Sequence, residues 1–135
     1  MRAPDRIVIV GCGAAKRDGP CAAADLYTGS LFRAGRRAAE ALAPGRWLIL
    51  SARFGLLAPQ VPVRRYELRL GQPGAVEPWQ LAAQAAGYGV VSCAVTVLAG
   101  YPYAELCREV WAQVDEPLAH LGTGPRLARL AAMAR

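Results

Sequence analysis

The sequence predicts a single α/β domain in three layers, with a small, mainly parallel sheet flanked by helices. Three observations support this fold class. Short apolar runs alternate with amphipathic segments of helical length, as in βαβ units. The runs lack polar alternation, which is typical of strands buried on both faces. The chain has 135 residues, enough for one core and too few for two ordinary ones, so we expect one domain over residues 1–135.

The first predicted strand covers residues 7–10, where four β-branched residues follow one another. It stops at Gly11, Cys12 and Gly13, and Lys16 follows closely. Glycine lets a ligand approach the main chain and leaves amide groups free to face an anion, and Lys16 would add a positive charge. We therefore expect a binding site at the carboxyl end of this strand.

The second predicted strand, residues 47–50, follows an amphipathic helix that ends near Leu42. It also stops in small polar and charged residues, among them Ser51 and Arg53. The next segment, residues 58–74, holds three prolines and has little periodicity. Loops of this length in compact domains are usually functional or mobile.

The third predicted strand covers residues 94–99 and follows a helix that opens at Glu77-Pro78, where proline is tolerated in the first turn. It ends at Gly100 and Tyr101. Three successive strands thus finish in residues suited to a ligand, and we expect these ends to lie at one edge of the sheet.

The clearest helix is predicted over residues 103–114, where apolar residues recur at intervals of three and four. Residues 116–121 are compatible with a short fourth strand or an extended loop. A final helix is expected after the Gly-Thr-Gly-Pro sequence at 122–125.

Composition favours a soluble, cytoplasmic protein without cofactor or metal. Hydrophobic residues make up 54% of the chain and charged residues 19%, which argues against disorder. No apolar run approaches the ~18 residues needed to cross a bilayer. The four cysteines form no C-x-x-C pair and no cluster with histidine, so neither a zinc site nor a disulfide framework is supported.

The net charge of +6 comes almost wholly from arginine, because Lys16 is the single lysine. Arginine-rich surfaces favour phosphate-bearing partners, including DNA or RNA. The alternative is a compositional bias from lysine to arginine, as in GC-rich genomes, which would carry no information about partners.

Ligands of parallel α/β sheets bind outside the carboxyl ends of the strands. This rule gathers the candidate ligand-binding residues along one rim: Gly11, Cys12, Gly13, Lys16, Ser51, Arg53, Gly100 and Tyr101. Loops that leave this rim and could fold over it carry four further candidates: Asp25, Tyr27, Tyr66 and Glu67.

Several of these residues lie in motifs that resemble a known family. The motifs are Gly-Cys-Gly-x-x-Lys at 11–16, Asp-Leu-Tyr-Thr-Gly-Ser-Leu-Phe at 25–32, Leu-Ser-Ala-Arg-Phe-Gly-Leu-Leu at 50–57, Tyr66-Glu67 and Leu-Ala-Gly-x-x-Tyr at 98–103. Together they resemble a family of small bacterial and phage proteins known as a domain of unknown function. Such proteins are distantly similar to YaaA peroxide-stress proteins and to the uracil-DNA-glycosylase-like domain of archaeosine synthase. The resemblance implies dealings with nucleobases or nucleic acid and lends no established reaction.

Lys16 and Arg53, at the ends of adjacent strands, are the candidate anchors for a phosphate or a base carbonyl. The alternative is that each is a solvated charge on the rim. Cys12 becomes a nucleophile if Lys16 and nearby amides favour its thiolate; otherwise it is a small residue at a crowded strand end. His120, the single histidine, is expected to be structural.

Glu67 and Asp25 offer carboxylate chemistry at a sugar, since a carboxylate can stabilise an oxocarbenium-like transition state or attack the anomeric carbon. Tyr27 and Tyr66 could stack on a base or hydrogen-bond to it. The alternatives are that Asp25 caps a turn and that Glu67 pairs with a neighbouring arginine.

The predicted function is the handling of a nucleotide, nucleoside or exposed nucleobase, with cleavage or transfer at an N-glycosidic bond. The sequence lacks a phosphate loop, a serine elbow and a complete dinucleotide fingerprint, whereas glycosidic chemistry needs a carboxylate, a base pocket and an anion anchor. The alternatives are a non-catalytic nucleic-acid-binding stress protein and a nucleotide-sensing module.

Overall fold

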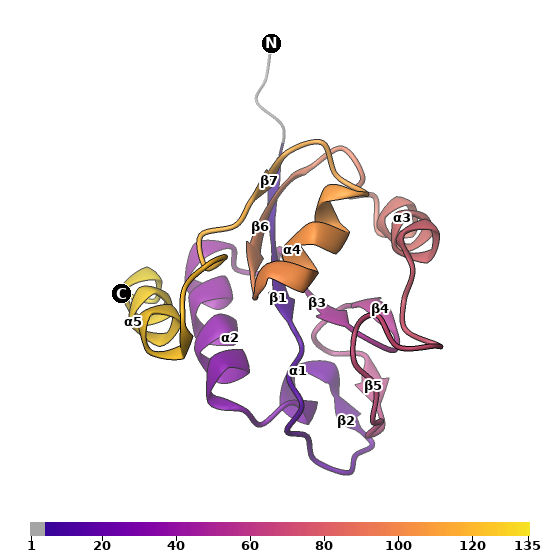
Figure 1. The fold of residues 1–135 in the computed structure, drawn as a ribbon, viewed down its shortest axis with the longest axis horizontal. Coiled ribbons are helices and arrows are strands. Elements are labelled where there is room, and N and C mark those ends of the chain that lie inside the picture. The colour runs from indigo at the N-terminus through magenta and orange to yellow at the C-terminus, as the bar shows by residue number, and fades with distance from the viewer. Residues whose placement is uncertain (1–4) are drawn as a thin grey trace.

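The computed structural model describes residues 5–135 and has an α/β fold (Figure 1). Its main sheet has the strand order β4-β3-β1-β6-β7. Only β4 in this sheet runs antiparallel to its neighbour. The predicted fold class, with a mainly parallel sheet between helices, is confirmed. The strands are β1 (Arg6–Gly11), β3 (Trp47–Ser51), β4 (Gly55–Leu57), β6 (Ala94–Leu98) and β7 (Val114–Asp115).

Strand β1 lies at the centre of the sheet, and Val8 is paired with Trp47 on one side and Thr96 on the other. Its side chains alternate between two cores. Val8 and Val10 belong to one cluster of buried residues, while Ile7 and Ile9 belong to the other. Burial on both faces explains why this strand is apolar without alternation.

Helices α2 (Ser30–Leu42) and α5 (Thr123–Met133) cover one face of the sheet. Helices α3 (Pro78–Gly87) and α4 (Tyr101–Arg108) cover the other, as Figure 1 shows. None of the helices within residues 5–135 is long and apolar enough to cross a membrane.

The segment at 58–74 is tied to the chain before α2 by a second, two-stranded sheet. In it, β2 (Cys21–Ala22) pairs antiparallel with β5 (Pro62–Val63). The short helix α1 (Ala23–Leu26) follows, and its first amides donate to carbonyls of this segment. These elements form the lower part of the molecule in Figure 1.

Two sequence predictions need correction. The helix predicted over 103–114 ends at Arg108, because the chain turns back to the sheet and Val114–Asp115 pairs with β6 as β7. Of the two alternatives open for residues 116–121, the structure shows a loop, with a turn at 117–120, and the fourth parallel strand precedes it. The hairpin from β3 to β4 was also missed, and it depends on Gly55, whose φ of 73° few other residues adopt.

Candidate functional site

The strand order of the sheet reverses between β1 and β6. The chain leaves β1 toward α2 on one face and leaves β6 directly into α4 on the other. Divergent connections of this kind open a crevice at the carboxyl ends of the two strands, where α/β proteins bind their ligands. The reversal thus locates the candidate site.

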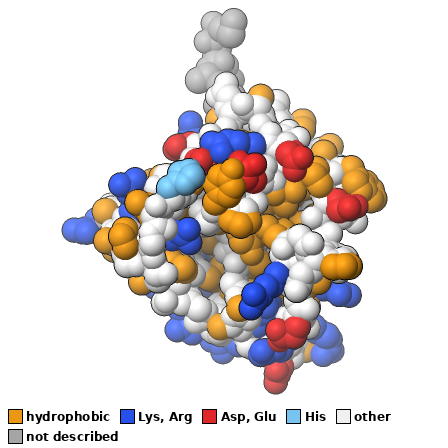
Figure 2. Space-filling model, viewed as in Figure 1, with side chains coloured by type: hydrophobic (Ala, Val, Ile, Leu, Met, Phe, Trp, Pro, Cys, Tyr) orange, Lys and Arg blue, Asp and Glu red, His pale blue; other side chains and the backbone are white. Residues whose placement is uncertain are grey.

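A cavity of about 280 Å³ lies at this position, and we call it the switch-point cavity. The face of the molecule in Figure 2 is hollowed between α5 and α4. The cavity is lined by apolar side chains, glycines, one thiol, one phenol and one guanidinium: Gly11, Cys12, Gly13, Leu31, Phe32, Leu98, Ala99, Gly100, Pro102, Tyr103, Leu118, Arg126 and Leu130.

Another hollow, of about 450 Å³, lies along residues 71–80 at the surface. Its lining has no cation and no thiol, and Glu77 supplies its one ionisable side chain. The switch-point cavity is smaller, but it combines a cation, a thiol and an apolar wall. It is therefore the better candidate for a binding or catalytic site.

Two glycines shape the floor of the switch-point cavity. A Cβ on Gly11 would come within 2.6 Å of the Ala99 Cβ, so β1 and the end of β6 can approach only with glycine there. A Cβ on Gly13 would meet nothing within 4 Å, because this residue faces open space. The predicted use of these glycines, approach of a ligand to the backbone, stays a prediction, because at Gly11 the close neighbours are side chains of the protein itself.

Cys12 lies between the two glycines, and its sulfur has polar neighbours. The Sγ atom is 3.2 Å from the hydroxyl of Tyr103 and accepts a hydrogen bond from the Ala52 amide at 3.4 Å. The Tyr103 hydroxyl also donates to the Cys12 carbonyl at 3.3 Å. The Ala52 amide can stabilise a thiolate, and the Tyr103 phenol can do so when its one proton turns from the Cys12 carbonyl to the sulfur.

Tyr27, Ser51 and Tyr66 form a buried group that we call the hydroxyl cluster. The Tyr27 and Tyr66 hydroxyls are 2.7 Å apart, and Ser51 Oγ donates to the Tyr66 hydroxyl at 2.8 Å. Ser51 Oγ also accepts from the amides of Arg53 and Phe54, at 3.2 and 3.0 Å. The cluster therefore fixes the turn that leaves β3.

Burial is the main cause of the raised pKa of three tyrosines, Tyr27, Tyr66 and Tyr103. It raises the pKa of Tyr27 to about 12, with a further contribution from the nearby Cys12. Burial, followed by the proximity of Cys12, also raises the pKa of Tyr66 and of Tyr103 far above the usual range. All three phenols therefore stay protonated at neutral pH.

Lys16 adjoins the hydroxyl cluster. Its side chain is 8% exposed, and its Nζ lies 4.5 Å from the centroid of the Tyr66 ring and donates to the Ala14 carbonyl at 3.1 Å. Arg65 donates to the Lys16 carbonyl at 2.7 Å. Lys16 contacts no carboxylate among the described residues and does not line the switch-point cavity.

Arg53 and Tyr101 are exposed at the rim. The Arg53 guanidinium lies 5.6 Å from the Phe54 ring, and the Tyr101 ring lies 5.5 Å from His120. Neither residue lines the cavity, although Gly100 does.

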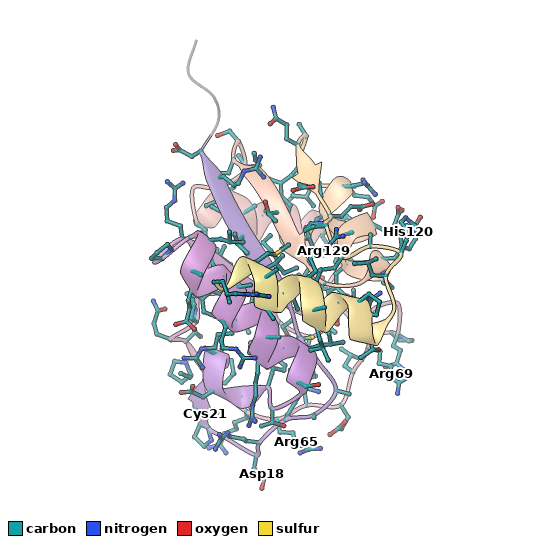
Figure 3. All side chains as sticks on the ribbon, turned by 90° about the vertical axis from the view of Figure 1, so that its left-hand side faces the viewer. Asp18, Cys21, Arg65, Arg69, His120 and Arg129 are labelled. Carbon is teal, nitrogen blue, oxygen red and sulfur yellow. The ribbon has the colours of Figure 1, made fainter. Side chains whose placement is uncertain are left out.

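The two predicted carboxylates lie at the surface in ion pairs. Asp25 accepts from Arg36 at 2.8 Å, and Glu67 accepts from Arg65 at 2.8 Å. Arg65 lowers the pKa of Glu67. Arg65 lies at the lower end of the molecule in Figure 3. Neither carboxylate lines the cavity, and their predicted catalytic roles stay predictions.

Two polar residues of the cavity, Tyr103 and Arg126, were missing from the site predicted from sequence. Tyr103 was counted as part of an apolar helix stripe and a motif, although its spacing after Gly100 places it one turn into α4. Arg126 had no local signal, because it reaches the cavity through the packing of α5 against α2.

Comparisons with known proteins show which family the chain belongs to. Neither the curated proteins nor the solved structures gave a match. A family model matches residues 7–132, which include all strands of the main sheet, the hydroxyl cluster and the switch-point cavity. The chain therefore belongs to the family of unknown function DUF6884.

Proposed function

We propose that this protein binds a nucleotide, nucleoside or exposed nucleobase in the switch-point cavity and cleaves or transfers its N-glycosidic bond. The observation that carries the proposal is the lining of that cavity, which puts a thiol and a guanidinium beside an apolar wall at the strand-order reversal. The sequence motifs resemble a family that is distantly similar to a glycosylase-like domain, which favours the same class of ligand.

The two kinds of lining suit the two parts of a nucleotide. Leu31, Phe32 and Leu118 offer apolar surface for a base and the carbons of a sugar, while Arg126 offers donors for an oxyanion. At about 280 Å³ the cavity is just below the roughly 300–1,000 Å³ typical of small-molecule sites. This size favours a single nucleotide unit over a duplex.

Cys12 is the candidate nucleophile that lines the cavity. Its sulfur would attack the anomeric carbon, the bond from that carbon to the base nitrogen would break, and the thiol proton would end on the departing base. Water, or a second base, would then displace sulfur, releasing the sugar or its new glycoside and returning the proton to Cys12. Tyr103 and the Ala52 amide would stabilise the thiolate that exists before the attack and the charge that returns to the sulfur when it is displaced.

Glu67 and Asp25 remain the alternative groups to serve the sugar. Arg65 keeps Glu67 ionised, as that role requires, but both carboxylates would have to move from their ion pairs to the cavity. Cys12 needs no such movement, so we place it first.

The rival proposal is a nucleic-acid-binding protein without catalysis, favoured by the net charge of +6. On the face in Figure 2, however, Lys and Arg side chains are scattered and stand beside acidic ones in the upper part and at the lower end. A phosphate-tracking protein predicts affinity that falls steeply with salt and tolerates loss of Cys12. A pocket enzyme predicts a weak salt dependence and sensitivity to that loss.

The test is incubation with nucleosides, 5′-nucleotides and short single-stranded DNA, followed by mass spectrometry for free base and for a sugar adduct on the Cys12 peptide. We expect base release by the wild type, and loss of adduct and at least a hundredfold slower release in Cys12→Ala. Cys93→Ala is the matched control, because Cys93 precedes β6 at the opposite end of the sheet.

Two results would contradict the proposal. Retention of a ligand with neither base release nor adduct would favour the binding protein. Release at the wild-type rate by Cys12→Ala would remove Cys12 from the mechanism and direct the test to Glu67→Gln and Asp25→Asn.

A further inference from the structure

Helix α5 brings one arginine into the switch-point cavity. The guanidinium of Arg126 lies against Gly100, where a Cβ would come within 3.2 Å of both its terminal nitrogens. Gly100 precedes the first turn of α4, so the guanidinium and the amino end of that helix face the same space. A glycine at this position leaves room for Arg126 beside the cavity floor.

Arg126 differs from the other unpaired arginines. Within residues 5–135, seven arginine side chains make no hydrogen bond or ion pair, and six of them are exposed: Arg17, Arg33, Arg37, Arg53, Arg64 and Arg69. Arg126 is half-buried, and its buried Nε has no partner. No carboxylate lines the cavity. A buried N–H donor of a guanidinium without an acceptor is unfavourable unless a ligand supplies one.

We infer that Arg126 is a specificity residue that selects a nucleotide carrying a terminal phosphate over the corresponding nucleoside. This inference rests on the proposed function and names its substrate class. The planar guanidinium fork matches two phosphate oxygens, and a phosphate monoester brings about two negative charges to a site without other anions. The free end of a monoester also suits a cavity the size of a single nucleotide.

Within the cavity, Cys12 and Arg126 would have separate roles. Cys12 lies on the β1 loop and Arg126 on the C-terminal helix, so the reacting bond and the phosphate are held by different elements. Loss of Arg126 should therefore weaken binding of nucleotides without removing the thiol chemistry on nucleosides.

Calorimetric titration tests the inference with the common nucleoside 5′-monophosphates, the matching nucleosides and ribose 5-phosphate. We expect wild type to bind its preferred 5′-monophosphate at least tenfold more tightly than the nucleoside. Arg126→Met, which keeps the aliphatic stem, should weaken the monophosphate about tenfold to a hundredfold and leave the nucleoside unchanged. Arg126→Lys, which keeps the charge without the planar guanidinium, should bind the monophosphate with an affinity between those of wild type and Arg126→Met.

Arg129→Met is the matched control, because Arg129 lies on the same helix, is exposed and donates to the Pro117 carbonyl (Figure 3). It should bind every ligand as wild type does. Thermal unfolding establishes that each variant is folded, and the wild-type comparison of nucleotide with nucleoside tests the inference even if Arg126→Met does not fold.

The outcomes separate this inference from the proposed function. Equal affinity of wild type for nucleotide and nucleoside, or unchanged monophosphate affinity in folded Arg126→Met, would overturn the inference even if bases are released. Binding of ribose 5-phosphate that Arg126→Met loses, with no binding or cleavage of any nucleoside or nucleotide, would support a phosphate site and refute the nucleotide function.

Discussion

The switch-point cavity and the hydroxyl cluster both adjoin Cys12, but they differ in hydrogen bonding. In the cluster, the hydroxyls of Tyr27, Ser51 and Tyr66 bond to one another at 2.7–2.8 Å. In the cavity, the buried Nε of Arg126 has no partner. Satisfied buried groups hold a fold together, whereas an unsatisfied one needs an explanation, for which we propose a ligand. We therefore expect the cluster to stabilise the fold and the cavity to recognise a ligand.

The most severe test of this comparison is Tyr66→Ala. The Tyr66 ring lies between Lys16 and Phe54, at 4.5 and 5.3 Å, and its hydroxyl serves both Tyr27 and Ser51. Its truncation creates a cavity and leaves two hydroxyls without their partner. We expect a loss of about 3–5 kcal/mol in the free energy of unfolding, measured in urea.

The control is Tyr101→Ala, since Tyr101 is 46% exposed and should leave the free energy of unfolding unchanged within error. A Tyr66→Ala protein as stable as this control would show that the cluster is not structural, and the comparison would fail.

The next largest expected effect is the loss of folding stability at alkaline pH that the buried Tyr27 phenol causes. The pKa of Tyr27 is about 12 in the folded protein, against an ordinary value of 10, so the folded state holds this proton more tightly than the unfolded state. The resulting stability is fully present below pH 10 and is lost as pH rises toward 12. The shift corresponds to roughly 2–3 kcal/mol.

Tyr27→Phe should therefore show a flatter decline in stability between pH 10 and 12 than wild type. Cys107, whose pKa burial raises to about 12, contributes equally to both proteins and cancels in the difference. Parallel declines in the two proteins would contradict a buried, protonated Tyr27.

The fold could be predicted because strands that are buried on both faces appear in the sequence as short apolar runs without polar alternation. The same reasoning placed Gly11, Cys12, Gly13 and Gly100 at one edge of the sheet, and all four line the cavity. Position along a parallel strand is a local property, so sequence is sufficient for it.

The remaining cavity and cluster residues depend on contacts between distant segments. Arg126 reaches Gly100 through helix packing, and Tyr66 reaches Ser51 through a loop whose path is set by β2 and β5. Neither contact has a periodic signature in the sequence. The path of that loop also decides that Glu67 is at the surface beside Arg65.

Ser51→Ala should lower the free energy of unfolding less than Tyr66→Ala does, and by less than the alkaline effect of Tyr27. It removes the acceptor of the Arg53 and Phe54 amides and a donor to Tyr66, while the methyl group keeps most of the volume. We expect a loss of about 1–2 kcal/mol in urea unfolding. Ser92→Ala, at an exposed position, should cost nothing measurable. If Ser51→Ala lowered the free energy of unfolding no more than Ser92→Ala does, the turn after β3 would not depend on the hydroxyl cluster.

The smallest expected effects are those of Asp25→Asn and Glu67→Gln. Both carboxylates are exposed, at 56% and 72%, and exposed ion pairs contribute little because water and salt screen them. The urea midpoints should therefore match wild type. If Cys12 is the nucleophile, base release should also match, since neither carboxylate lines the cavity. Loss of base release in folded Glu67→Gln would instead mean that the loop bearing Tyr66 and Glu67 moves to the cavity during turnover. The cluster would then belong to the machinery that positions a catalytic loop, and the division between a stabilising and a recognising region would have to be abandoned.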